Sequence, residues 1–192
     1  MKVLIACEKS GKVREAFKKL GHEAWSCDLL KSDIDSPNHF ECDVNLVLKK
    51  YTDWDMMIAF PPCTHLCVSG ARWFKDKQKE QKEALKFVKT LMDYPIKKIA
   101  IENPIGIIST KIRKPDQIIQ PYQFGHGETK ATCLWLKNLP KLISTNIVDG
   151  REARIHKMPP GKDRGMLRSI TYDGIANAMA EQWGKITTTD YL

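Results

Sequence analysis

The chain has 192 residues, a formal net charge of +8 and 42% hydrophobic residues. This length suits one compact domain and excludes a catalytic domain joined to a large specificity domain, and the composition excludes a largely disordered chain. No apolar run reaches the roughly 18 residues of a membrane span, and the N-terminus becomes charged too soon for a signal peptide, so we expect a cytoplasmic protein with reduced cysteines. The positive charge favours a polyanionic partner such as nucleic acid, although ordinary solubility charge explains it equally well.

Short apolar runs alternate with amphipathic helical patterns along the chain. In chain order, the pattern predicts a strand over 3–6, a helix over 12–20, strands over 23–27 and 55–60, a helix over 75–92, strands over 98–101 and 132–136, and a helix over 174–183. This alternation predicts an α/β fold with a doubly wound, mostly parallel sheet and helices on both faces.

Residues that can bind a ligand or take part in a reaction follow four of the predicted strands. In such a sheet, ligands bind beyond the carboxyl ends of the strands, which meet at one edge. We therefore expect these turns to form one site. The turns are Cys7 to Gly11, Asp28, Pro61 to Thr64, and Glu102 to Pro104.

The first two turns each allow two interpretations. A strand, a turn with Gly11 and a helix bring backbone amides near a nucleotide-like ligand, but an ordinary β–α turn has the same pattern. Asp28 ends the second strand, where an acid commonly binds the ribose hydroxyls of an adenosine ligand; a helix cap or a solvated acid is the alternative. Asp43, after a third strand, allows the same two interpretations.

The other two turns carry a thiol and a carboxyl group. Cys63 follows two prolines, and a cysteine held there can act as a nucleophile once its pKa is lowered; a small buried apolar residue is the alternative. Enclosure of Glu102 would keep its carboxyl group protonated and able to donate a proton; a capping or ion-paired acid is the alternative. We predict no metal site, because no standard zinc spacing occurs among Cys63, His65, Cys67, His126 and Cys133.

These motifs resemble those of the DNA cytosine carbon-5 methyltransferases. Residues 62–72, Pro-Cys-Thr-His-Leu-Cys-Val-Ser-Gly-Ala-Arg, are similar to the catalytic loop of that family, and residues 102–104 resemble its Glu-Asn-Val motif. Residues 7–11 stand where the family has Phe-x-Gly-x-Gly, and residues 174–179 resemble its last motif. The order and spacing match from residue 3 to about residue 184, and the chain looks most like the short phage and prophage members.

The resemblance implies a Rossmann-like, S-adenosylmethionine-dependent methyltransferase fold, as one catalytic domain over residues 1–192. It implies that a Cys63 thiolate adds to carbon 6 of cytosine, that Glu102 hydrogen-bonds the ring, and that carbon 5 takes the methyl group of S-adenosylmethionine. In duplex DNA, the target base must first leave the stack. DNA is the implied partner, and protection of phage DNA from restriction is the implied role.

The resemblance also assigns two sets of binding residues. The cofactor pocket would use Cys7, Glu8, Gly11, Asp28, Asp43, Phe60, Asn177 and Ala178. The substrate would be held by Pro62, Thr64, Arg72, Asn103, Lys130, Arg164 and Arg168.

The chain departs from the family's pattern at several positions. Lys9 replaces the first motif glycine, Thr64 replaces a glutamine and Pro104 replaces a valine. The family's Gln-x-Arg-x-Arg motif is not evident, and Lys130 is the nearest basic residue.

A basic stretch at residues 149–168 lies where the family has a target recognition domain. Only about 30 residues separate Leu136 from Arg168, too few for an independent domain. Its glycines and prolines predict a loop, and its basic side chains suit phosphate contacts, which set affinity without reading sequence. A solvated surface loop is the alternative. The lysines at the start of the helix over 75–92 allow the same two interpretations.

Three functions stay open at this point. The chain is an active DNA cytosine methyltransferase, or a related enzyme that acts on a nucleotide or single-stranded nucleic acid, or a catalytically silent protein that binds nucleic acid or the cofactor. Retention of Cys63 and Glu102 argues against the third function, whereas the missing arginine motif argues for it.

Overall fold

The strands form one sheet in the part of the chain that the computed structural model describes, residues 1–68, 76–162 and 164–185. Its strand order is β3-β2-β1-β4-β5-β7-β6. The strands are β1 (Lys2–Ala6), β2 (Glu23–Asp28), β3 (His39–Glu41), β4 (Met56–Ala59), β5 (Lys98–Pro104), β6 (Gln117–Ile119) and β7 (Thr132–Lys137). Neighbouring strands from β3 to β5 are parallel, whereas β7 is antiparallel to β5 and β6. The predicted α/β fold with a mostly parallel sheet is confirmed.

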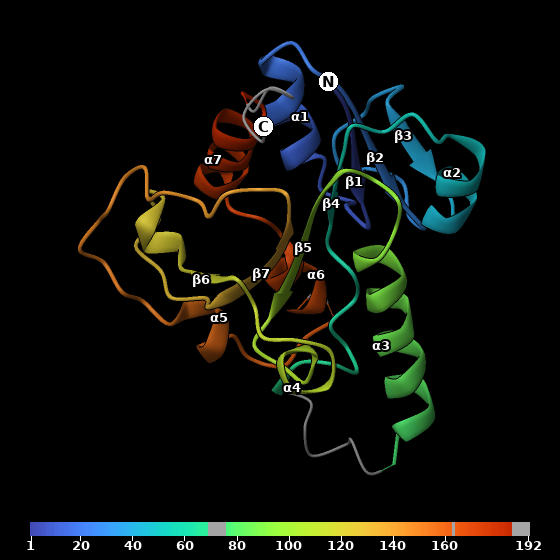
Figure 1. The fold of residues 1–192 in the computed structure, drawn as a ribbon. Helices are drawn as coiled ribbons and strands as arrows, with labels where there is room; N and C mark the ends of the chain where they lie inside the picture. The colour runs from blue at the N-terminus through green and yellow to red at the C-terminus, as the bar shows by residue number, and fades with distance from the viewer. Residues whose placement is uncertain (69–75, 163, 186–192) are drawn as a thin grey trace.

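Helices cover both faces of the sheet (Figure 1). The longer helices are α1 (Lys12–Lys19), α2 (Val44–Lys50), α3 (Gln78–Met92) and α7 (Asp173–Trp183). Short helical turns complete the chain: α4 (Ile108–Lys111), η2 (Pro121–Gln123), α5 (Arg154–Lys157) and α6 (Arg164–Ser169). Helices α1 and α7 pack together on one face, while α2 and α3 lie on the other. Among the described residues, no helix is both long and apolar enough to cross a membrane.

Two separate cores explain why β1 is apolar at every position from Val3 to Ala6. Val3 and Ile5 pack in the core beneath α1 and α7, whereas Leu4 and Ala6 pack in the core beneath α2 and α3. Successive side chains of a strand point to opposite faces, so a strand covered on both sides has no solvent-facing position.

The structure differs from the sequence predictions in three places. The strand over 132–136 was expected in a mostly parallel sheet, but as β7 it runs antiparallel to its neighbours. The basic stretch at 149–168 was expected to be a loop, but it contains α5 and α6. The first helix was expected to run over 12–20, but α1 ends at Lys19, and Leu20 is its C-cap and is 45% exposed.

Candidate active site

The predicted turns meet at one cleft of about 380 Å³ at the carboxyl ends of the strands. All four turns line it, with Cys7, Glu8, Asp28, Pro62, Cys63, Thr64, Glu102, Asn103 and Pro104 among the lining residues. Phe60 and Lys130 also line the cleft. Helix α6 contributes Gly165, Met166, Arg168 and Ser169. The parallel direction of β1, β2, β4 and β5 brings these distant segments together.

Cys63 lies on a rigid turn that follows β4. Its main-chain carbonyl accepts hydrogen bonds from the amides of Leu66 at 2.9 Å and Cys67 at 3.0 Å, which closes one helical turn. The side-chain amide of Asn103 donates to the carbonyl of Pro61 at 2.7 Å. The end of β5 therefore fixes the turn that presents the thiol.

The surroundings of Cys63 favour the protonated thiol. A hydrogen bond with the Cys67 thiol, burial, and the negative charge of Glu102 together raise the pKa of Cys63 well above its usual range. Since the thiolate is the nucleophile, Cys63 must lose its proton before a reaction begins, and neutralisation of Glu102 makes this loss easier.

Glu102 and Lys130 form an oppositely charged pair in the same cleft. Burial raises the pKa of Glu102, while the charge of Lys130 and a hydrogen bond with Thr132 oppose the rise. Burial lowers the pKa of Lys130, and its Nζ donates to the carbonyl of Ile170 at 3.3 Å. Burial thus favours the protonated form of Glu102, the form that a general acid requires.

A side cavity of about 220 Å³ adjoins the cleft and shares Cys7, Asp28 and Pro62 with it. Asp43 also lines this cavity, and its Oδ1 caps α2 by accepting from the Asn45 amide at 2.8 Å. Burial raises the pKa of Cys7 to about 12, with the charges of Asp28 and Asp43 adding to the rise. Both predicted ribose-binding acids therefore lie at one cavity beside Cys63.

The N-terminus of α1 is occupied by the chain's own carboxylate. Glu8 is 4% exposed, and its carboxyl oxygens accept from the amides of Val13 at 2.8 Å and Arg14 at 3.4 Å. Gly11 is required here, because its φ is +71° and a Cβ would lie 2.7 Å from Arg14 Nη2. A helix N-terminus normally attracts a phosphate, but here Glu8 would repel one. This geometry favours a cofactor that carries no phosphate.

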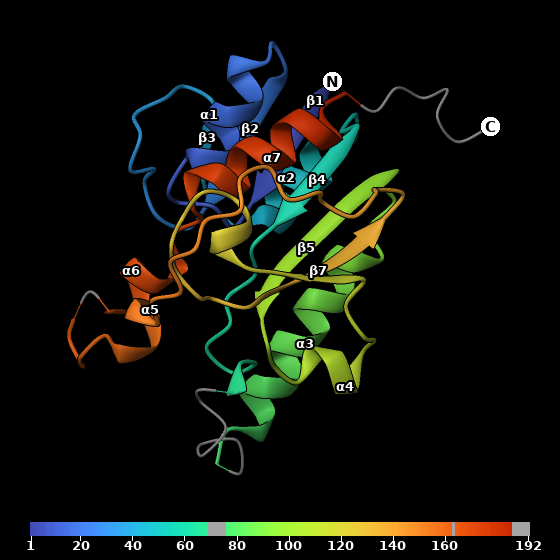
Figure 2. The same ribbon diagram turned by 90° about the vertical axis from the view of Figure 1, so that its left-hand side faces the viewer.

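The basic stretch forms a groove, called here the basic groove, of about 580 Å³, lined by Arg151 to Arg154 and Lys157 to Pro159. Figure 2 shows the segment that carries α5 and α6 at one edge of the molecule. The Arg151 guanidinium stacks on the ring of Tyr122, 3.5 Å from its centroid. The residues that line the groove include three basic ones, Arg151, Arg154 and Lys157, and one acid, Glu152. The net positive charge of the groove suits a phosphate backbone.

A polar chain connects the basic groove to the cleft. Arg154 Nη2 donates to Glu128 at 2.9 Å, and the Tyr172 hydroxyl donates to the same carboxylate at 2.7 Å. The Nζ of Lys130 lies 5.7 Å from the centroid of the Tyr172 ring. The groove and the cleft are therefore parts of one packed region.

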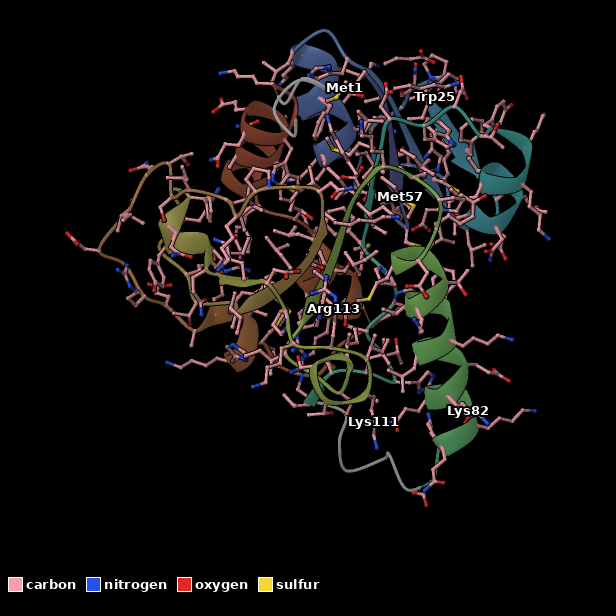
Figure 3. All side chains as sticks on the ribbon, viewed as in Figure 1. Met1, Trp25, Met57, Lys82, Lys111 and Arg113 are labelled. Carbon is pink, nitrogen blue, oxygen red and sulfur yellow. The ribbon has the colours of Figure 1, made fainter. Side chains whose placement is uncertain are left out.

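Some predicted site residues lie elsewhere. Asn177 is exposed on α7 and Ala178 packs in the core under that helix, so neither lines the cleft or the side cavity. Arg164 donates to the carbonyl of Met158 at 2.9 Å and does not line the cleft, whereas Arg168 does. Arg72 lies outside the described residues. Lys82 of α3 points away from the sheet (Figure 3).

Sequence reasoning missed two supporting residues. Arg14 is fully buried, and its guanidinium donates to Ser26 at 2.7 Å, Ser32 at 3.1 Å and the carbonyl of Ile34 at 2.9 Å. It thereby fixes the loop after β2 beside the cleft. Met166 of α6 contacts Lys9 across the cleft mouth. A charged residue within an apolar helix face was a signal for Arg14, but nothing in the local pattern pointed to Met166.

Comparisons with known proteins find no relative by sequence and a distant likeness to solved structures. No protein-family model matches the chain. No curated protein matches it either. Among solved structures, it is similar to a candidate DNA modification methyltransferase encoded within a prophage of E. coli, with 14% sequence identity and a TM-score of 0.47 over 70% of this chain. The match spans 45% of that protein's length, and at this level the likeness carries no inference about activity.

Proposed function

We propose that the chain is a methyltransferase that uses S-adenosylmethionine to methylate carbon 5 of cytosine in DNA. The observation that carries this proposal is the meeting of two groups in one cleft beside Lys130: Cys63, on the turn after β4, and Glu102, near the end of β5. A nucleophilic thiol, a carboxyl group that can hold a proton and a cation are the groups that addition to a pyrimidine ring requires. The proposal places the protein in the cytoplasm of a prokaryotic or phage-infected cell.

The side cavity and the adjoining part of the cleft fit S-adenosylmethionine. The carboxylates of Asp28 and Asp43 suit ribose hydroxyls or an amino group, and Cys7 and Pro62 supply apolar walls. Glu8 at the start of α1 suits the ammonium group of a methionine moiety and disfavours a pyrophosphate. When bound, the cofactor supplies the electrophilic methyl group that the activated carbon 5 accepts.

Cys63 and Glu102 activate the cytosine ring. The Cys63 sulfur forms a bond to carbon 6, and the electron pair of the ring's 5,6 double bond moves toward carbon 5. Glu102 donates its proton to nitrogen 3, which neutralises the charge that the addition places on the ring. Loss of the carbon-5 proton after methylation restores the double bond and expels the Cys63 thiolate. Since Glu102 faces Cys63, its protonated form also removes the charge that raises the pKa of the thiol.

The basic groove and Arg168 support a nucleic-acid substrate. Phosphate contacts from such side chains position a strand without reading its sequence, which suits a chain with no separate target recognition domain. Pro62, Thr64 and Asn103 line the cleft where a base that has left the stack would lie. A free cytosine nucleotide or single-stranded nucleic acid is the alternative substrate.

One experiment tests the proposal. The protein is incubated with labelled S-adenosylmethionine and duplex, single-stranded or mononucleotide cytosine substrates, beside the Cys63→Ala and Glu102→Gln variants. We expect methyl incorporation into cytosine that is abolished in Cys63→Ala and reduced at least a hundredfold in Glu102→Gln, in line with the usual contribution of a general acid.

The substrate dependence of incorporation separates DNA from the alternatives. Cofactor binding without transfer to any substrate supports a silent binding protein. Absence of cofactor binding in equilibrium dialysis contradicts the cofactor assignment. Fold retention in each variant is checked by thermal unfolding.

A further inference from the structure

Two thiols lie together at the edge of the cleft. The side chains of Cys63 and Cys67 are hydrogen-bonded to each other, and both residues are half-buried. The Cys67 amide donates to the Cys63 carbonyl at 3.0 Å. One helical turn separates two Cα atoms by about 6 Å, within the roughly 4.4–6.8 Å that disulfides span.

The loop after β5 holds this turn in place. The Ile107 amide donates to the carbonyl of Leu66 at 2.9 Å, and the Val68 amide donates to the carbonyl of Ile105 at 3.1 Å. Between them, Gly106 approaches so closely that a Cβ there would lie 2.1 Å from the Leu66 oxygen. The backbone between the two thiols is thus fixed by contacts on its far side, which keeps the sulfur atoms close.

We propose that Cys63 and Cys67 are a thiol–disulfide modification site, at which a reversible disulfide removes the nucleophile from the cleft. The bond itself depends only on the two cysteines, whereas its effect on methyl transfer rests on the proposed function. In a reducing compartment, disulfides of this kind are transient and report the redox state of the cell.

The oxidant is a low-molecular-weight disulfide such as oxidised glutathione. Cys63 lines the cleft. Its sulfur loses its proton and attacks one sulfur of the small disulfide, whose other half leaves as a thiolate and takes up a proton. The Cys67 sulfur, also deprotonated, then attacks Cys63 and expels the second half. Two protein thiols and one small disulfide become one protein disulfide and two small thiols. Because the pKa of Cys63 is raised, we expect this reaction to accelerate as the pH rises.

A second pair of neighbouring thiols provides the internal comparison. Cys27 and Cys42 also interact, and the Cys27 thiol donates to the Cys42 carbonyl at 3.2 Å. Cys27 is fully buried, whereas Cys63 is only half-buried and lines the cleft, so an external disulfide should reach Cys63 more readily than Cys27. The reaction should therefore select Cys63 and Cys67.

The test is mass spectrometry of the full chain after incubation with oxidised glutathione at pH 8. We expect a loss of about 2 Da, which non-reducing peptide mapping assigns to Cys63 and Cys67 and which dithiothreitol reverses. In Cys67→Ser the second step is blocked, so a glutathione adduct of about 305 Da should accumulate on Cys63. Cys67→Ala repeats this test with a smaller side chain, and Cys42→Ser, the matched control, should behave as wild type.

Two results would overturn the inference. One is a stable glutathione adduct on wild-type Cys63 without cross-linking, and the other is a disulfide that maps to Cys27 and Cys42. Methyl transfer is measured on the same samples, and we expect at least a tenfold loss that dithiothreitol restores. If the reduced protein transfers no methyl group, the proposed function fails while the mass measurement still decides the disulfide.

Discussion

The side-chain amide of Asn103 donates a 2.7 Å hydrogen bond to the carbonyl of Pro61, and this bond ties the end of β5 to the turn that presents Cys63. Asn103 is 1% exposed, and its Oδ1 has no partner in the described part of the chain. Because Glu102 is its chain neighbour, one strand end sets the position of both the proposed acid and the proposed nucleophile.

We expect Asn103→Ala to lower methyl transfer at least tenfold and to cost about 1–2 kcal/mol of the free energy of unfolding, since it leaves a buried carbonyl without its donor. The measurements are the rate constant and urea unfolding. Gln117→Ala is the matched control, because Gln117 also donates to a main-chain carbonyl, that of Leu142 at 2.7 Å, away from the cleft. Equal rate losses in the two variants would contradict a positioning role for Asn103.

Gly106 is the point at which the loop after β5 touches the Cys63 turn. A Cβ at Gly106 would lie 2.1 Å from the Leu66 oxygen and 3.0 Å from Cys67 Cα, so Gly106→Ala must displace the backbone of that turn. We expect a loss of about 1–3 kcal/mol in thermal unfolding. Gly161→Ala is the control, because no atom lies within 4 Å of its Cβ position. A Gly106→Ala variant as stable as wild type would show that the two segments are not tightly packed.

The pKa of Cys63 predicts slow alkylation of this thiol at neutral pH. Glu102→Gln removes a negative charge that raises the pKa, so the fraction of thiolate at any given pH should increase. We expect alkylation of Cys63 by iodoacetamide at pH 8, followed by peptide mapping, to become at least about threefold faster, since one pKa unit is tenfold in thiolate. Glu152→Gln, at an exposed acid in the basic groove, should leave the rate unchanged. An unchanged rate in Glu102→Gln would mean that Glu102 is uncharged or does not face the thiol.

Glu128 links Arg154 to Tyr172, and this network makes stability depend on pH. Partial burial opposes ionisation of Glu128, but hydrogen bonds from Arg154 and Tyr172 hold its pKa below the usual value. A lowered carboxyl pKa stabilises the folded state above the unfolded pKa, and that stability disappears as the pH falls through the folded pKa. We expect Tyr172→Phe to cost about 1 kcal/mol at pH 7 and markedly less at pH 3 in urea unfolding. An equal loss at both pH values would assign the effect to packing instead.

The basic groove predicts a steep salt dependence of nucleic-acid binding. Removing two phosphate contacts with Arg151→Ala and Lys157→Ala should reduce the slope of log affinity against log salt concentration by about 1.4–1.8. Fluorescence anisotropy with a labelled oligonucleotide measures this slope. Lys19→Ala with Lys49→Ala is the matched control, because both lysines are exposed in the last turns of α1 and α2. Similar slopes in the two double variants would exclude the groove as the phosphate contact.

The local sequence pattern determined the strands and helices and the edge of the sheet at which the candidate site residues lie. Apolar runs such as 3–6 are strands because they are buried on both faces, and an alternating strand–helix order forces parallel neighbours. Cys63 follows one such strand and Glu102 lies near the end of another, so their position at a common edge was predictable from the residues alone.

Only the tertiary structure decided which side chains face one another there. Lys130 and α6 reach the cleft across long loops, β7 enters the sheet antiparallel, and Asn177 and Ala178 lie away from both cavities. The contact of Cys63 with Cys67 likewise depends on a turn held by the loop around Gly106. Local propensity and periodicity indicate which segments form helices or strands and which faces are buried. These contacts arise instead from the packing of segments far apart in the chain, on which a local pattern carries no information.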